Sequence, residues 1–406
     1  MYLVKFLLIA VLLSFIFGEF AHFPFGSSAG AVYLSDILLV FAIIFFIIWN
    51  TIAKTRIIIP KVFYPMLIFW IVAGISLLLS FTFFPWEEVV KGGLYLVRLI
   101  AYSTIFVIIF NLKKKQIISK EGVINTLIAI GIFLSCLGFI QLFLFPNFEN
   151  INFSLTSYGF DPHQGRLAST FLDPNFTGAY LVLTLVLILY RLSLRIYEKK
   201  LWLLSALLIV SIILTYSRSA YLMLTVTVIV IGTLNWKNIN NRARLAGIFV
   251  SLTVMVVSAI FFPRALDRIV SGLSLDKTSM ERVESWQAGW KIVQEKPILG
   301  VGFNNVRLVK QQLNLFKTYT PDGGHAGAGI DSSLLTVWAT TGSLGLIVYL
   351  SFGLGIARGL FKKGGLFSVM ILGALAGLVV ESQFINSLFY PPIMAWYFSV
   401  IGVLLD

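Results

Sequence analysis

Long apolar runs recur along the whole chain and constrain its fold more than any other feature of the sequence. The runs cover residues 4–20, 31–50, 62–82, 92–111, 123–145, 174–190, 201–216, 219–235, 245–262, 332–356, 365–381 and 390–405. A helix needs about 20 apolar residues to span a bilayer, and within lipid only helices and closed barrels satisfy the backbone hydrogen bonds. The runs therefore predict an all-α integral membrane protein with about 12 transmembrane helices.

The composition excludes several other classes of protein. Of the 406 residues, 58% are hydrophobic and 12% are charged, whereas soluble domains have about 45–50% and about 25%. The net charge of +13 does not indicate a nucleic-acid partner, because the basic residues are scattered between apolar runs. The single cysteine, Cys136, and the three histidines argue against a disulfide framework and a multi-histidine metal site. These counts therefore predict no metal centre built from cysteines or histidines.

The charges of the loops predict an orientation. Short loops rich in Lys and Arg follow alternate runs, and the positive-inside rule places them in the cytoplasm. Both ends of the chain are then expected inside, in a multi-pass protein of the cytoplasmic membrane. The first run lacks a small-residue cleavage site, so we expect a retained span. The loops expected on the outer face are 21–30, 83–90, 146–173, 217–218, 263–331 and 382–389.

The same pattern divides the chain into four regions. They are residues 1–165 with about five spans and the first large outer loop, 166–262 with arginine-bearing spans, 263–331 as a helical extracytoplasmic loop, and 332–406 with the last spans. The long outer loop is basic, which indicates an anionic ligand on the outer face.

Local signals predict structure inside the loop 263–331. Thr278 and Glu281 have capping-box spacing and predict a helix over 279–295, with Trp286 and Trp290 on its apolar face. Such a helix is typical of the lipid headgroup level. We expect a second helix over 304–316 and a mobile, glycine-rich lid at 321–329.

Arg218 is the most informative single residue. It lies between two apolar runs with almost no loop, and an arginine at bilayer depth costs about 2.5–3.5 kcal/mol on insertion scales. One interpretation is a turn residue that extends to the interface. The other is a phosphate ligand, because guanidinium binds phosphate oxygens in pairs. Arg166 and Arg282 are expected on the same face, so the three arginines could converge on a diphosphate.

Two residues near the last large loop could transfer protons. His325 is the only histidine of that loop and suits a general acid or base, although an exposed histidine explains it equally well. Asp331 precedes Ser332 at a span entrance, where it could cap the helix, act as a base, or do both.

Other charges lie near the outer ends of spans. Asp36 and Arg98 lie at similar depth, about five and seven residues inside their spans, and we expect a structural ion pair. Glu381 could be structural or functional. Asp173 before Pro174 predicts a helix cap just after Arg166.

These motifs together resemble the O-antigen ligase and O-antigen polymerase superfamily, the multi-span GT-C-type glycosyltransferases. The resemblance runs from about Arg166 to Gly345. Its motifs are Arg166-Leu-Ala-Ser-Thr-Phe-Leu-Asp-Pro-Asn175, Tyr216-Ser-Arg218-Ser-Ala, Arg282 with Trp286, Pro297-Ile-Leu-Gly-Val-Gly302 and Gly342-Ser-Leu-Gly345. The family's ligases carry a histidine at a fixed spacing before Gly-x-x-Gly, and Asp331 stands at that position here. His325 lies six residues earlier.

The resemblance implies a function. The donor would be a glycan on undecaprenyl pyrophosphate at the outer face of the cytoplasmic membrane, and an acceptor hydroxyl on a glycan or lipid would attack its anomeric carbon with inversion and without a metal. Arg166, Arg218 and Arg282 would bind the pyrophosphate, and Asp331 and His325 would be catalytic. The reaction would serve cell-surface polysaccharide assembly, such as lipopolysaccharide biosynthesis, as either a ligase or a polymerase.

A transporter or flippase for a lipid-linked anion remains an alternative, because 12 spans with both ends inside are common in transporters. It predicts charges and helix breaks near the bilayer midplane in matched halves, whereas the unusual residues of this chain lie mostly at the outer face. A scaffold of envelope assembly is a third possibility.

Overall fold

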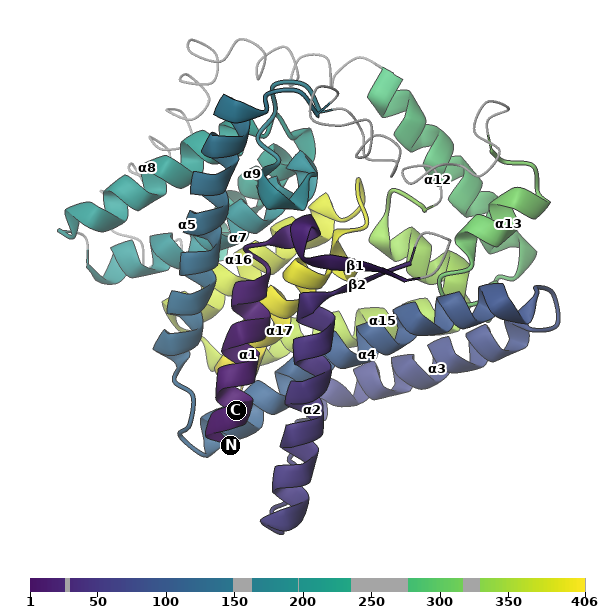
Figure 1. The fold of residues 1–406 in the computed structure, drawn as a ribbon, viewed down its shortest axis with the longest axis horizontal. Helices are drawn as coiled ribbons and strands as arrows, with labels where there is room; N and C mark the ends of the chain where they lie inside the picture. The colour runs from purple at the N-terminus through teal and green to yellow at the C-terminus, as the bar shows by residue number, and fades with distance from the viewer. Residues whose placement is uncertain (26–29, 149–162, 196, 235–276, 317–328, 406) are drawn as a thin grey trace.

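The computed structural model describes residues 1–25, 30–148, 163–195, 197–234, 277–316 and 329–405. Nearly all regular structure in these ranges is helical, as Figure 1 shows. The α-helices are α1 (Tyr2–Ser14), α2 (Leu34–Ile52), α3 (Tyr64–Ser80), α4 (Trp86–Lys114), α5 (Lys120–Leu144), α7 (Pro174–Leu194), α8 (Lys199–Leu214), α9 (Arg218–Leu234), α12 (Lys277–Glu295), α13 (Val306–Gln312), α15 (Ser333–Lys363), α16 (Gly365–Glu381) and α17 (Pro391–Leu404).

The helices agree with an all-α membrane protein. Eleven of the twelve expected apolar runs coincide with a helix in the described part of the chain, and six segments there are long and apolar enough to cross a membrane. These six are Leu34–Ile52, Lys61–Ser80, Trp86–Lys114, Lys120–Leu144, Pro174–Leu194 and Ser333–Lys363. The expected run at 245–262 lies outside the described residues, so the total of 12 spans stays a prediction.

Burial separates the central helices from the peripheral ones. Almost every residue of α17 and most residues of α7 are buried, so these apolar helices form the centre of the bundle. Helix α2 instead exposes large apolar side chains such as Ile44, Ile47 and Ile48. A helix that is apolar on all sides must be covered by protein or by lipid. The exposed faces of α2 are therefore suited to lipid.

A short β-hairpin lies between α1 and α2. The single turn η1 (Gly18–Ala21) follows α1, and strands β1 (His22–Phe25) and β2 (Gly30–Tyr33) pair antiparallel with His22 opposite Tyr33. Figure 1 shows the hairpin between the α1–α2 pair and the side of the molecule that carries α12 and α13. This position brings the N-terminal segment to the candidate site.

Helix α15 is broken at Gly342, where φ is +66° and ψ is −173°. The loop Pro297–Gly302 docks against this break. The N–H groups of Ser343 and Leu344 donate to the carbonyls of Pro297 and Ile298 at 2.8 and 3.3 Å, and Val301 N–H donates to the Ala339 carbonyl at 3.0 Å. Two motifs of the sequence therefore contact each other directly, because each supplies the backbone partners that the other needs.

Candidate functional site

Helix α12 is anchored to the protein by Trp286. The indole N–H donates to the carbonyl oxygens of Asp331, at 2.9 Å, and Gln383, at 3.1 Å. The indole ring also packs against Phe384, with centroids 5.7 Å apart. Trp286 is therefore held by protein groups, and the placement of α12 at the lipid headgroup level stays a prediction. The helix also begins earlier than expected, since it already includes Lys277.

The anchoring of α12 places Arg282 close to Asp331. Ser285, on the same helix, accepts a hydrogen bond from the backbone N–H of Asp331 at 3.0 Å. Burial raises the pKa of Asp331 above its ordinary value of 3.8, although the positive charges of Arg282 and Lys310 and a hydrogen bond from Ser285 oppose the rise. Burial also lowers the pKa of Arg282. A carboxylate with a raised pKa is a stronger base than an exposed one.

Lys310 supplies a second cation to the same place. It lies on α13, is only 5% exposed, and donates from Nζ to the carbonyl of Gly329 at 2.5 Å. Burial lowers the pKa of Lys310, and Asp331 partly opposes this shift. Helix α13 is shorter than the segment 304–316 expected from the sequence.

Arg218 and Glu381 lie around Arg282. Arg218 is the first residue of α9, directly after a turn in which Tyr216 has a φ of +47°. The positive charge of Arg218 lowers the pKa of Arg282, whereas the carboxylate of Glu381 raises it. Glu381 is fully buried and accepts a hydrogen bond from the hydroxyl of Ser387. The charges of Arg218 and Arg282 are therefore close enough to influence each other.

Arg166 makes a different set of contacts. Its guanidinium donates from Nε to the carbonyl of Thr215 at 2.9 Å, and from one Nη to Tyr216 O at 3.4 Å and to Asn175 Oδ1 at 3.3 Å. Arg166 therefore binds the turn that leads into Arg218 and the start of α7. There Asp173 caps α7 as expected, because its carboxylate accepts from the N–H groups of Asn175 and Phe176.

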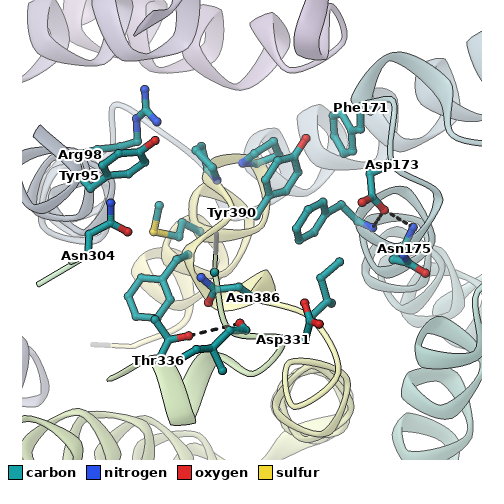
Figure 2. Close-up of a pocket in the computed structure, with 18 of the residues that line it drawn as sticks. Tyr95, Arg98, Phe171, Asp173, Asn175, Asn304, Asp331, Thr336, Asn386 and Tyr390 are labelled. Atoms are coloured by element: carbon teal, nitrogen blue, oxygen red, sulfur yellow. Dashed lines mark hydrogen bonds between the residues drawn. The ribbon is translucent and has the colours of Figure 1, made fainter. Parts of the chain in front are cut away.

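A cavity of about 890 Å³ collects residues from many elements. Arg282, Ser285, Lys310, Asp331, Asp173 and Asn386 are among its lining residues. Figure 2 shows Arg98 and Tyr95 on one side, Asp173 and Asn175 on the opposite side, Asp331 on a third side, and Asn386 and Tyr390 between them. Among the three arginines expected to bind pyrophosphate, Arg282 lines the cavity, whereas Arg166 and Arg218 are not among its lining residues.

The expected ion pair between Asp36 and Arg98 is confirmed. One Nη of Arg98 lies 2.6 Å from Asp36 Oδ2 and also donates to the carbonyl of Ala31. Asp36 lies in the first turn of α2 and accepts from the backbone N–H of Tyr33, so it is nearer to the helix end than expected. The pair belongs to the wall of the cavity, because Arg98 lines it.

The sequence reasoning missed several lining residues. It grouped Lys310 with the other basic residues of its loop and singled out neither Glu19 nor Asn386, which also line the cavity. Glu19 lies at the end of the first apolar run, just before an expected outer loop, and a charge at that position was the available signal. His325 lies in the segment 317–328, which is outside the described residues. The expected lid at 321–329 overlaps the same segment.

Comparison with known proteins gives a match in the part of the chain that carries several residues of the candidate site. No curated protein matches the chain. Residues 203–350, which are less than half of the chain, match the sequence model described as O-antigen ligase. The matched segment contains Arg218, Arg282, Lys310 and Asp331, whereas Arg166 lies before it. This match supports an assignment of the matched segment to the O-antigen ligase/polymerase family.

Proposed function

We propose that the protein is a metal-independent, inverting membrane glycosyltransferase. It transfers a glycan from undecaprenyl pyrophosphate to an acceptor sugar hydroxyl at the outer face of the cytoplasmic membrane. The observation that carries the proposal is the meeting of Arg282, Lys310 and Asp331 at one cavity, within the segment that matches the O-antigen ligase model. Two cations beside a carboxylate with a raised pKa suit a reaction that releases a diphosphate and removes a proton.

The two cations support the leaving group. As the bond between the anomeric carbon and the diphosphate breaks, negative charge grows on the diphosphate oxygens. Arg282 and Lys310 are already placed at the cavity, so they stabilise this charge without reorganisation. Guanidinium binds phosphate oxygens in pairs, while the ammonium of Lys310 acts as a point charge. In this proposal, Arg218 adds positive potential near Arg282, and Arg166 positions the turn that leads into Arg218.

Asp331 is the proposed general base. The acceptor oxygen forms a bond to the anomeric carbon, the hydroxyl proton passes to the Asp331 carboxylate, and the lipid diphosphate leaves with the electron pair of the broken bond. One displacement inverts the anomeric centre. The Trp286 anchor holds the Asp331 backbone to the helix that carries Arg282, so base and leaving-group ligand keep a fixed relation during the step.

The test is a reconstituted transfer reaction. Purified protein in liposomes receives a lipid-linked oligosaccharide, and the products are separated by mass. We expect release of undecaprenyl pyrophosphate, unchanged by a metal chelator. Chain lengthening without another acceptor indicates a polymerase, and attachment to a distinct lipid indicates a ligase. Movement of labelled substrate across the membrane without any covalent change would contradict the proposal and favour the transporter.

Matched variants locate the site. We expect Arg282→Ala and Asp331→Asn each to lower kcat by about 10²–10³, the loss typical of one transition-state group. Arg307→Ala and Glu295→Gln are the controls, because both side chains are exposed and neither lines the cavity. Equal rates for Arg282→Ala and Arg307→Ala would remove the proposed role of Arg282.

A further inference from the structure

The cavity has a second polar wall that the proposed reaction does not use. It is formed by Glu19 in η1, Tyr33 at the end of β2, Tyr95 in α4 and Tyr390 before α17. We propose that this wall is a saccharide subsite that binds the sugar of the acceptor, opposite the cations that bind the donor diphosphate. The inference rests on the proposed function and deepens it by assigning the acceptor's binding residues.

Contacts within the protein connect the side chains of this wall to one another. The hydroxyl of Tyr33 donates to Glu19 Oε2 at 2.7 Å. The guanidinium of Arg98 lies 5.3 Å from the ring centre of Tyr33 and 5.6 Å from that of Tyr95. Because Asp36 binds Arg98 at 2.6 Å, the guanidinium holds both rings in place. A prearranged wall of this kind loses little conformational entropy on binding.

Its chemistry suits a sugar. Tyr95 is 41% exposed and lines the cavity, so it offers an aromatic surface against which the C–H groups of a pyranose can pack. Glu19 offers carboxylate oxygens to hydroxyl donors, and tyrosine hydroxyls can donate or accept. A small set of placed polar groups beside aromatic side chains is typical of a specific binding site.

The subsite continues toward the centre of the cavity. Tyr390 lines the cavity and stacks on Phe176, with ring centres 4.2 Å apart. Figure 2 shows Tyr390 and Asn386 between the Arg98–Tyr95 side and the Asp173 side. Asn386 Oδ1 is buried and has no hydrogen-bond partner among the described residues. A buried acceptor of this kind is costly unless a donor such as a sugar hydroxyl reaches it.

Charge distinguishes this wall from the proposed diphosphate site. The carboxylate residue Glu19 lines it, and the charge of Arg98 is balanced by Asp36. A second diphosphate would therefore be repelled here, while a sugar hydroxyl would not. Since the cations Arg282 and Lys310 belong to α12 and α13, donor and acceptor would approach the reacting carbon from different walls of the cavity.

The test separates acceptor binding from donor binding. In the reconstituted reaction, we measure the KM for an oligosaccharide acceptor released from the producing cell's own surface polysaccharide, and the KM for the lipid-linked donor. Tyr95→Ala and Glu19→Gln are expected to raise the acceptor KM about tenfold or more and to leave the donor KM within twofold. Tyr95→Phe keeps the ring and should raise the acceptor KM less than Tyr95→Ala does. Glu88→Gln is the control, because Glu88 lies on the same helix as Tyr95 but does not line the cavity.

Two results would overturn the subsite. One is an unchanged acceptor KM in folded Tyr95→Ala and Glu19→Gln, and the other is a larger change in the donor KM than in the acceptor KM. Direct binding of the same oligosaccharide, followed by tryptophan fluorescence of the protein in nanodiscs, makes the inference independent of turnover. One outcome is that wild type binds the sugar and Tyr95→Ala does not, while neither protein transfers glycan. In that case the subsite stands and the proposed function fails. If wild type transfers glycan and Tyr95→Ala binds the sugar normally, the function stands and the subsite fails.

Discussion

Replacing Gly342 by alanine tests how the break in α15 and the loop 297–302 support each other. At Gly342 the backbone has a φ of +66° with an extended ψ, a combination almost confined to glycine. A Cβ built there would lie 2.1 Å from the carbonyl oxygen of Ile298 and 2.4 Å from the N atom of Leu299. Both are backbone atoms, so the loop Pro297–Gly302 would have to move away from α15.

The cost of Gly342→Ala follows from these contacts. The unfavourable backbone conformation costs about 1–3 kcal/mol. Displacement of the loop also weakens the hydrogen bonds from Ser343 and Leu344 to Pro297 and Ile298, each worth about 1 kcal/mol. We therefore expect Gly342→Ala to lower the free energy of unfolding by about 3–5 kcal/mol. Activity should fall as well, because the displaced loop directly follows α12, the helix that bears Arg282.

Unfolding in mixed detergent micelles, titrated with sodium dodecyl sulfate and followed by tryptophan fluorescence, measures this change. Gly353→Ala is the matched control, because Gly353 lies on the same helix and a Cβ there meets nothing within 4 Å. Alanine should be neutral or better at that position, by about 0.5–1 kcal/mol. If the two variants unfold at the same detergent concentration, the docking of the loop on the helix break does not stabilise the protein as argued.

Three other predictions concern charges at the cavity. Transfer should need Asp331 deprotonated and Lys310 protonated. Burial raises the pKa of Asp331 from 3.8 and lowers the pKa of Lys310 from 10.5. The acid limb of the pH–rate profile should therefore lie above pH 3.8, and the alkaline limb should lie below pH 10.5. A profile that is flat across both regions would contradict these assignments. Asp36→Asn leaves Arg98 without its carboxylate and should lower the free energy of unfolding by about 3 kcal/mol, measured by detergent unfolding. An unchanged free energy of unfolding would mean that water solvates Arg98. Asp173→Ala removes the cap of α7 and should cost about 1 kcal/mol in the same assay, with Asp173→Asn, which can still cap, as the variant that separates capping from charge.

The sequence was sufficient to predict most helices of the described residues, but it did not predict the hairpin of β1 and β2. Apolar runs of spanning length predict helices with little ambiguity, and local signals such as Asp173 before Pro174 set one boundary within the described structure. The ion pair of Asp36 with Arg98 was predictable, because two charges at similar depth in lipid need each other. The break in α15 was not predicted, since Gly342 is tolerated within a helical pattern until a neighbouring loop is known to need that space.

The candidate site was only partly predictable, for a physical reason. A basic residue in an outer loop can bind a ligand or satisfy backbone carbonyls, and the sequence does not show which carbonyls lack donors. Arg166 binds Thr215 and Tyr216 O, whereas Arg282 lines the cavity. The places of Lys310 and Glu19 in the cavity could not be predicted for a related reason. Both depend on segments that are far apart in the chain and meet only in the folded protein.

The shared indole hydrogen bonds of Trp286 have a consequence for protein engineering. One N–H joins three pieces of chain, the helix α12, the entrance of α15 at Asp331 and the segment that follows α16 at Gln383. A chimera that exchanges α12 for the helix of another transferase would break this junction unless the residues around Gln383 are exchanged together with it. Grafting experiments aimed at new glycan specificity should therefore treat the three pieces as one cassette.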